Sequence, residues 1–179
     1  MAEDGVLDAM RVADLFTHIV HRTLSQRLIA ELTDDTVSLA QVQAMRYIWL
    51  HHNVLMGDLA EGLAISYPSA TNMVKRLERQ GLVERMVNPA DRREVEVRLT
   101  AHGTDICERM ESERVSRIKQ VLDAMTTPDR KALMEGLSRF VVAAAGDDDA
   151  VAQDVCLRCG VRAAPSCPIA QTHVLSICR

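Results

Sequence analysis

The chain has 179 residues, of which 47% are hydrophobic and 3% aromatic, with a formal net charge of -4. This length fits one domain, or one domain with an appendage, and the few aromatic residues favour a core of aliphatic side chains on long helices. The negative net charge excludes a protein that coats nucleic acid through bulk charge, so any DNA contact has to come from a local basic patch.

The residue pattern in the first half of the chain predicts one long helix followed by shorter helices. Apolar residues recur at helical spacing from Leu7 to Leu32, which predicts a single long amphipathic helix. The capping-box pattern of Ser38 and Gln41 predicts a second helix that runs to about residue 51. A short third helix is expected over about residues 57–63.

A fourth helix and a hairpin follow. Ser66 is expected to cap this helix, Pro68 is tolerated in its first turn, and Gly81 can end it in a left-handed conformation. Beyond Gly81 apolar and charged residues alternate on both sides of a turn at residues 88–91, which predicts a two-stranded hairpin with a basic tip. In its second strand Val95, Val97 and Leu99 alternate with Glu94, Glu96 and Arg98.

Two more helices are predicted before the C-terminal tail. Thr100 can cap a fifth helix that extends to about Met125, and Thr127 with the following Pro128 marks the start of a sixth. The sixth helix is expected to end near Gly146, where the acidic run at residues 147–149 indicates a solvated boundary.

Two short helices joined by a tight turn and followed at once by a hairpin are typical of a winged helix-turn-helix. The expected fold class is therefore mainly α with a small β-hairpin wing (α+β), a winged helix-turn-helix with a helical dimerisation region. The polar and basic side chains expected to contact DNA from the fourth helix and the wing are Ser69, Thr71, Asn72, Lys75, Arg76, Arg92 and Arg93.

The residue types on the fourth helix and the wing suit DNA. Hydroxyl and amide groups near a helix N-terminus suit base edges in the major groove, whereas Lys75 and Arg76 suit phosphates or guanine. A solvated helix face is the alternative for this helix alone, and the wing arginines Arg92 and Arg93 favour DNA contact through the minor groove or its phosphates. Asp91 is expected to hold one of these arginines in place.

The segments TNMVKRLERQGLVER (residues 71–85) and NPADRREVEVRLT (88–100), with Gly103 after them, resemble the MarR-type transcriptional regulators over roughly residues 38–105. The resemblance implies a triangular homodimer, built by the first, fifth and sixth helices, that reads a pseudo-palindromic operator in double-stranded DNA and usually represses transcription. Half-sites would lie about 10 base pairs apart. Met56 stands where the family often has a Ser or Thr cap, so a less firm start of the third helix is expected.

The resemblance also suggests a pocket for a small-molecule effector, although the scarcity of aromatic residues argues against phenolic ligands. The dimer is expected on physical grounds as well, because the first and last helices carry apolar stripes that a winged module cannot bury alone. The expected segments are an N-terminal dimerisation helix (1–34), a winged DNA-binding domain (35–100), C-terminal dimerisation helices (101–146) and a cysteine-rich tail (147–179).

Four of the five cysteines lie in the tail: Cys156, Cys159, Cys167 and Cys178. In a reducing cytoplasm such a group indicates metal ligands or redox thiols rather than disulfides. The C-x-x-C spacing predicts a knuckle with Gly160 in the turn behind it, and four thiolates are enough for an iron–sulfur cluster or tetrahedral zinc.

The Cys-Pro pair at residues 167–168 favours the iron–sulfur cluster, and the single C-x-x-C argues against zinc. Zinc and metal-free redox thiols stay open, as does His173 in place of Cys178. Because the tail has few large apolar residues, metal binding would supply much of its folding free energy, and its ordering would change the separation of the two DNA-binding heads. The fifth cysteine, Cys107, is expected to be a small buried hydrophobe.

These observations predict a dimeric repressor whose operator binding responds to a redox, metal or small-molecule signal. The alternatives are a regulator with a structural zinc tail, an electron-transfer protein centred on the cysteines, and an interaction module whose tail recruits a partner. The sequence contains no phosphate loop, nucleotide-binding glycine pattern or nucleophile elbow, which argues against an enzyme. No run is apolar enough to span a membrane and no signal peptide is recognised, so a cytoplasmic protein without membrane contact is expected.

Overall fold

The N-terminal segment is one helical rod with an irregular turn in it. The computed structural model describes residues 3–33, 36–51, 54–87, 94–159 and 167–169, with backbone alone at 3–4, 24–25 and 157–159. The rod consists of α1 (Glu3–His21), a π-helical turn η1 (Arg22–Gln26) and α2 (Arg27–Thr33). The long first helix is confirmed, and the π-turn inside it is a feature that the periodicity did not predict.

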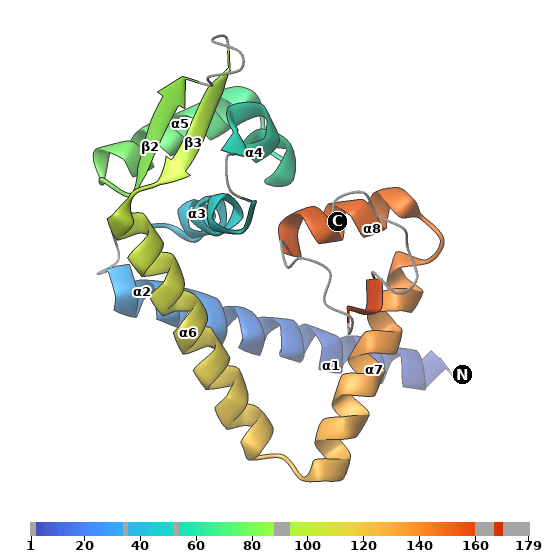
Figure 1. The fold of residues 1–179 in the computed structure, drawn as a ribbon. Coiled ribbons are helices and arrows are strands. Elements are labelled where there is room, and N and C mark those ends of the chain that lie inside the picture. Colours follow the sequence, from blue (N-terminus) through green and yellow to red (C-terminus); the bar gives the residue numbers. More distant parts are fainter. Residues whose placement is uncertain (1–2, 34–35, 52–53, 88–93, 160–166, 170–179) are drawn as a thin grey trace.

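The next elements form the head of the molecule (Figure 1). They are α3 (Leu39–His51), β1 (Val54–Leu55), α4 (Met56–Gly62), α5 (Tyr67–Arg79), β2 (Val83–Val87) and β3 (Val95–Leu99). The sheet is antiparallel with the order β1-β3-β2, so the predicted hairpin gains a short third strand on its β3 edge. Side chains from all three helices and from the sheet meet in one core, whose most buried members include Met45, Leu59, Val74, Leu77 and Val97. The mainly α fold with a winged helix-turn-helix is thus confirmed.

The sequence correctly predicted most helix starts, because they depend on local hydrogen bonds. Gln41 Oε1 accepts from the Ser38 amide at 2.9 Å and Ser38 Oγ accepts from the Gln41 amide at 3.3 Å, which completes the capping box. The Thr100 hydroxyl accepts from the Gly103 amide at 3.1 Å at the start of the next long helix. α4 begins without a hydroxyl cap, but the Asp58 carboxylate accepts from the Leu55 amide at 3.4 Å, so Met56 is free to be a buried core residue.

The alternation predicted for the second wing strand fails at Glu96. This residue is 4% exposed, whereas the pattern placed it on the solvent side with Glu94 and Arg98. β1 pairs with the outer edge of β3 and sets Leu55 opposite Glu96, so both edges of the strand are covered. The Glu96 carboxylate accepts from Arg98 Nε at 2.6 Å, which offsets the cost of burying its charge.

Three helices follow the sheet. They are α6 (Ala101–Asp123), α7 (Thr127–Ala145) and α8 (Asp149–Cys159). α6 leaves the head and crosses the α1–α2 rod, α7 turns back at an angle to α6, and α8 folds back toward the head (Figure 1). α8 packs against both α7 and α4.

The acidic run at residues 147–149 is exposed, as expected, and leads from α7 into α8, but the sequence did not predict the helix α8 that follows it. The Asp148 carboxylate accepts from the amides of Ala150 at 2.9 Å and Val151 at 3.4 Å, so this aspartate caps a helix. An acidic run before apolar residues has two uses, solvation and helix capping, and the sequence pattern did not separate them.

None of the helices in the described ranges is long and apolar enough to cross a membrane.

Gly103 tests the packing of the head, because a Cβ atom there would lie 2.0 Å from the backbone oxygen of Leu82. We expect Gly103→Ala to lower the free energy of unfolding by roughly 1–3 kcal/mol, since a backbone carbonyl cannot rotate away as a side chain can. The control is Gly57→Ala in α4, where the added Cβ meets nothing within 4 Å. Urea unfolding followed by Trp49 fluorescence at one protein concentration measures both, and equal stabilities of the two variants would contradict the packing argument.

Candidate nucleic-acid interface

α5 is amphipathic and is fixed to the head by one face. Ala70, Val74 and Leu77 are fully buried on that face. Ser66 caps the helix by accepting from the Ser69 amide at 3.3 Å, and Gly81 ends it with a φ of 70°. Residues on the opposite face are therefore held rigidly and directed away from the core.

The outward face of α5 is basic. Asn72, Lys75, Arg76 and Arg79 are exposed, and their spacing of three, four and seven residues places them on one side of the helix. Within the described part of the chain none of these four side chains makes a hydrogen bond or an ion pair. Their donors are available to a ligand, and the planar fork of arginine suits both phosphates and guanine.

Arg79 was missing from the predicted DNA contacts. It lies seven residues after Asn72 and four after Lys75, so continuing the same helical stripe by one turn would have found it.

Ser69 and Thr71 have local hydrogen bonds in this structure. The Ser69 hydroxyl lies 2.8 Å from the Ser66 hydroxyl, and the Thr71 hydroxyl donates to the Tyr67 carbonyl at 2.9 Å. Both groups therefore contribute to the first turn of α5, and each oxygen can still accept a further bond. Their contact with bases stays a prediction.

The wing lies beside α5. β2 pairs with β3 from Val83 opposite Leu99 to Val87 opposite Val95, and α5 packs against β2. Arg85 on β2 forms a 2.7 Å ion pair with Glu78, which neutralises the one acidic residue of α5 and ties the helix to the wing. Asp91, Arg92 and Arg93 lie outside the described residues.

The structure describes the side chains of two of the four tail cysteines, Cys156 and Cys167. Cys156 is buried, and Cys167 packs against the same small apolar cluster, which also contains Ala145, Ala152 and Ile169. Cys156 and Cys159 lie in the last turn of α8, so the described backbone of this pair is helical where a knuckle was expected. The Cys159 side chain and Cys178 lie outside the description, and the described residues contain no group of three or more His, Cys, Asp or Glu side chains that could hold a metal.

Cys107 is a buried core residue, as expected. Desolvation by burial is the main reason that its pKa is raised to about 12, and nearby Glu108 adds to the shift. The thiol is therefore protonated at neutral pH and is a poor nucleophile.

A cavity of about 250 Å³ lies between α2, α3 and α6. Its wall is mostly apolar and contains Leu28, Met45, Trp49 and Met110. Arg46 and Arg114 also line it, together with Glu111, whose carboxylate lies 3.9 Å and 3.7 Å from the two guanidinium groups, so a small, mostly apolar molecule with a polar group matches this lining.

Comparison with known proteins agrees with this arrangement. Residues 37–95 match the model of the MarR family. The multiple antibiotic resistance protein MarR of Escherichia coli is 30% identical over 125 residues, which are 70% of this chain and 87% of that protein.

Solved structures show the same fold. A MarR family protein from Bacillus stearothermophilus superposes with a TM-score of 0.67 at 21% identity, over 82% of this chain and 99% of that one. FabT of Streptococcus pneumoniae, solved in complex with DNA, has a TM-score of 0.65 at 20% identity, over 74% of this chain and 94% of that one. At these identities the likeness establishes the fold alone.

Lys75 provides a test of the basic face that needs no knowledge of a target sequence. If it contacts a phosphate, Lys75→Ala lowers the slope of log affinity against log salt by about 1 on any duplex, because one fewer counterion is released. The control is Lys131→Ala, an exposed lysine on α7. Fluorescence anisotropy with a mixed-sequence duplex between about 50 and 200 mM salt measures the slopes, and identical slopes for the two variants would remove α5 from the interface.

Proposed function

Because this chain belongs to the MarR family of DNA-binding transcriptional regulators, we propose that it binds a pseudo-palindromic operator as a homodimer and represses transcription from it. The observation that carries the proposal is the outward face of α5, where three cations and one amide have no partner within the described residues. A rigid helix with this composition beside a wing suits the major groove, with Asn72 at a base edge and the cations at phosphates or guanine. Ser69 and Thr71 lie near the start of the same helix, and DNA contacts of these two residues and of the wing arginines Arg92 and Arg93 are part of the proposal.

Exposed apolar side chains support the homodimer. On α1 they include Leu7, Met10, Leu15 and Ile19, with fractional exposures from 51% to 62%. α6 and α7 add Val115, Val121 and Phe140, which are 58%, 63% and 67% exposed. A second copy that covers these faces removes their exposed apolar side chains from water.

The tail is the first candidate for the signal. The described thiols have the donor chemistry of an iron–sulfur cluster or zinc, since Cys156 and Cys167 share one apolar cluster and Cys159 follows Cys156 by one helical turn. We favour the iron–sulfur cluster held by Cys156, Cys159, Cys167 and Cys178, with zinc as the alternative. An occupied site would hold α8 in place, and α8 contacts both the dimerisation helix α7 and the head helix α4.

The cavity between α2, α3 and α6 is the second candidate. Residues of α2, α3 and α6 all contribute to its wall, so a small, mostly apolar molecule bound there contacts the head together with the parts of the rod and of α6 that pack on it. Such a ligand changes operator affinity only by favouring one arrangement of these parts over another.

Sequence selection from random DNA tests the proposed function. We expect the purified protein to enrich two inverted half-sites whose centres lie about 10 base pairs apart, because two symmetric heads read one face of the duplex. Enrichment of a single asymmetric site, or of no site, would contradict operator binding by a dimer.

Leu15→Asp tests the dimer surface. A carboxylate on the exposed face of α1 is costly to bury, so we expect the dimer dissociation constant to rise at least about tenfold. Val87→Asp on β2 is a matched control, because Leu15 and Val87 are both 61% exposed. Sedimentation equilibrium without DNA compares them, and a dimer unchanged by Leu15→Asp would place the interface elsewhere.

Replacement of the four tail cysteines by serine tests the metal site. Protein purified without oxygen should contain stoichiometric iron and sulfide, or one zinc per chain, and the variant should contain neither because serine lacks a thiolate. Cys107→Ala is the control, since this buried thiol lies in the core of the head. A metal-free wild type would rule out both metals, and unchanged operator affinity in the variant would rule out sensing by the tail.

A further inference from the structure

We call the exposed part of the molecule, which consists of α1, α7 and the distal half of α6, the arm. The change from the buried head to this arm occurs at the crossing point of the rod and α6, on both helices. α2 is packed in the head, with Leu28 and Ile29 at 1% and 5% exposure, whereas α1 on the other side of η1 is exposed along its length. α6 changes in the same way, from buried Ile106 near its start to exposed Val115 and Val121 further along. The head thus ends, on both helices, where the rod crosses α6.

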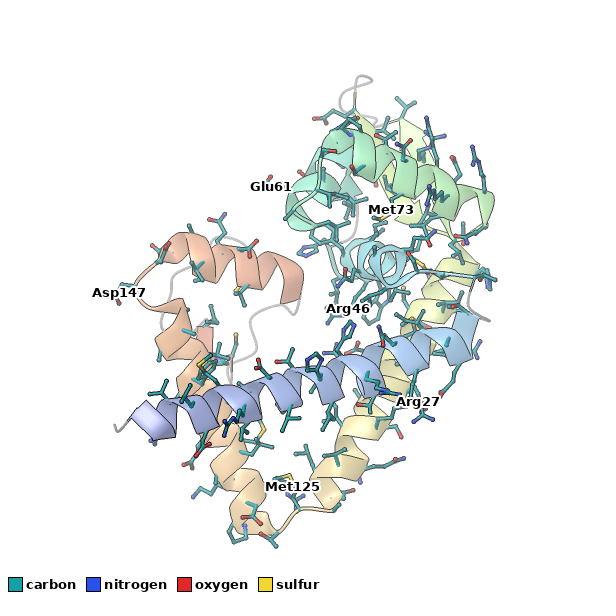
Figure 2. All side chains as sticks on the ribbon, turned by 180° about the vertical axis from the view of Figure 1, so that it is seen from behind. Arg27, Arg46, Glu61, Met73, Met125 and Asp147 are labelled. Carbon is teal, nitrogen blue, oxygen red and sulfur yellow. The ribbon has the colours of Figure 1, made fainter. Side chains whose placement is uncertain are left out.

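The π-turn η1 lies at this boundary and frees a backbone acceptor. The Arg27 amide donates to the Arg22 carbonyl, five residues back, where an α-helix would direct it to Thr23. The Thr23 carbonyl accepts instead from Arg117 Nη1 of α6 at 3.1 Å. Figure 2 shows Arg27 where the rod crosses α6.

Arg117 makes two further contacts with the same guanidinium. Its Nε donates to Glu113 Oε1 on α6 at 3.0 Å, and its Nη2 donates to the Glu31 carboxylate on α2. The arginine side chain is 21% exposed, whereas Glu31 and Glu113 are 50% and 45% exposed, so the value of the group lies in its three simultaneous contacts more than in either ion pair alone. One planar group therefore joins the π-turn, α2 and α6.

We propose that Arg117 is a positioning residue that fixes the angle between head and arm, and through it the distance between the two recognition helices of the dimer. The proposal rests on the dimeric operator binding proposed above. About 17 residues of α6 separate Arg117 from Thr100, where α6 joins the wing, which at 1.5 Å per residue is a lever of roughly 25 Å. A rotation of roughly 8° at the crossing moves the head by about 3.4 Å, the rise of one base pair.

The fork geometry is essential to this role. Lysine keeps the charge but has no planar group that reaches a carbonyl and two carboxylates at once. Arg117→Lys therefore separates positioning from charge, and Arg117→Gln removes both. The matched control is Lys119→Gln. Lys119 lies on the same helix, two residues after Arg117, and its substitution breaks an exposed ion pair with Asp123.

The experiment measures operator affinity as a function of half-site spacing. The selected operator is shortened or lengthened by one base pair, and wild type and the Lys119→Gln control should prefer the original spacing. In Arg117→Lys and Arg117→Gln we expect this preference to fall at least about fivefold, with affinity for an isolated half-site unchanged. A merely stabilising role would lower the melting temperature without changing the spacing preference.

A second measurement does not depend on DNA. A spin label introduced through an unnatural amino acid at position 84, an exposed site on β2, reports the distance between the two heads of the free dimer. We expect a broader or shifted distribution in both Arg117 variants. Unchanged spacing preference together with an unchanged distribution would overturn the proposal. Wild type that binds no paired half-sites would overturn the proposed function alone, and the distance distribution would then decide the role of Arg117.

Discussion

The hydrogen bonds around Leu82 hold the functional parts of the head together. The Leu82 carbonyl accepts from the Thr100 amide at 3.1 Å, and the Thr100 hydroxyl donates to the Gly81 carbonyl at 2.7 Å. Gly81 ends α5, Leu82 leads into β2 and Thr100 starts α6, so three elements meet within one small set of bonds. The close approach of Gly103 to Leu82 leaves no space for a side chain at this junction. α5, the wing and the start of α6 are consequently held together at this junction.

Beyond that junction the structure depends on contacts that one chain does not supply. The head buries its own apolar residues, whereas α1 and the distal parts of α6 and α7 expose theirs. In the proposed dimer, folding of these exposed parts is coupled to association, so the stability of the protein is expected to depend on its concentration. The same coupling would make the angle at the crossing of α6 and the rod a property of the dimer, because the partner would hold the exposed parts and each head would follow its α6.

Basic and acidic side chains are distributed differently over the head and the helices that leave it. The chain carries 25 acidic and 21 basic residues, yet the outward face of α5 presents three cations whose neighbour Glu78 is neutralised by Arg85. Several carboxylates on α2 and α6 are engaged in ion pairs, among them Glu31, Glu113 and Asp123. The overall negative charge opposes non-specific binding along DNA, whereas the basic outward face of α5 attracts phosphates to that face.

The sequence alone determined the features that depend on neighbouring residues. Periodicity located the helices, and Ser38, Ser66 and Thr100 marked their starts, because a cap is a bond between residues three positions apart. The exposed face of α5 followed from its apolar stripe in the same way. Features that join distant segments required the tertiary structure. Glu96 is buried because β1 pairs with β3, Asp148 caps a helix whose packing surface is provided by α7 and α4, and the carbonyl freed in η1 accepts a donor from residue 117. Such contacts depend on where the chain brings remote elements together, and no local spacing encodes that.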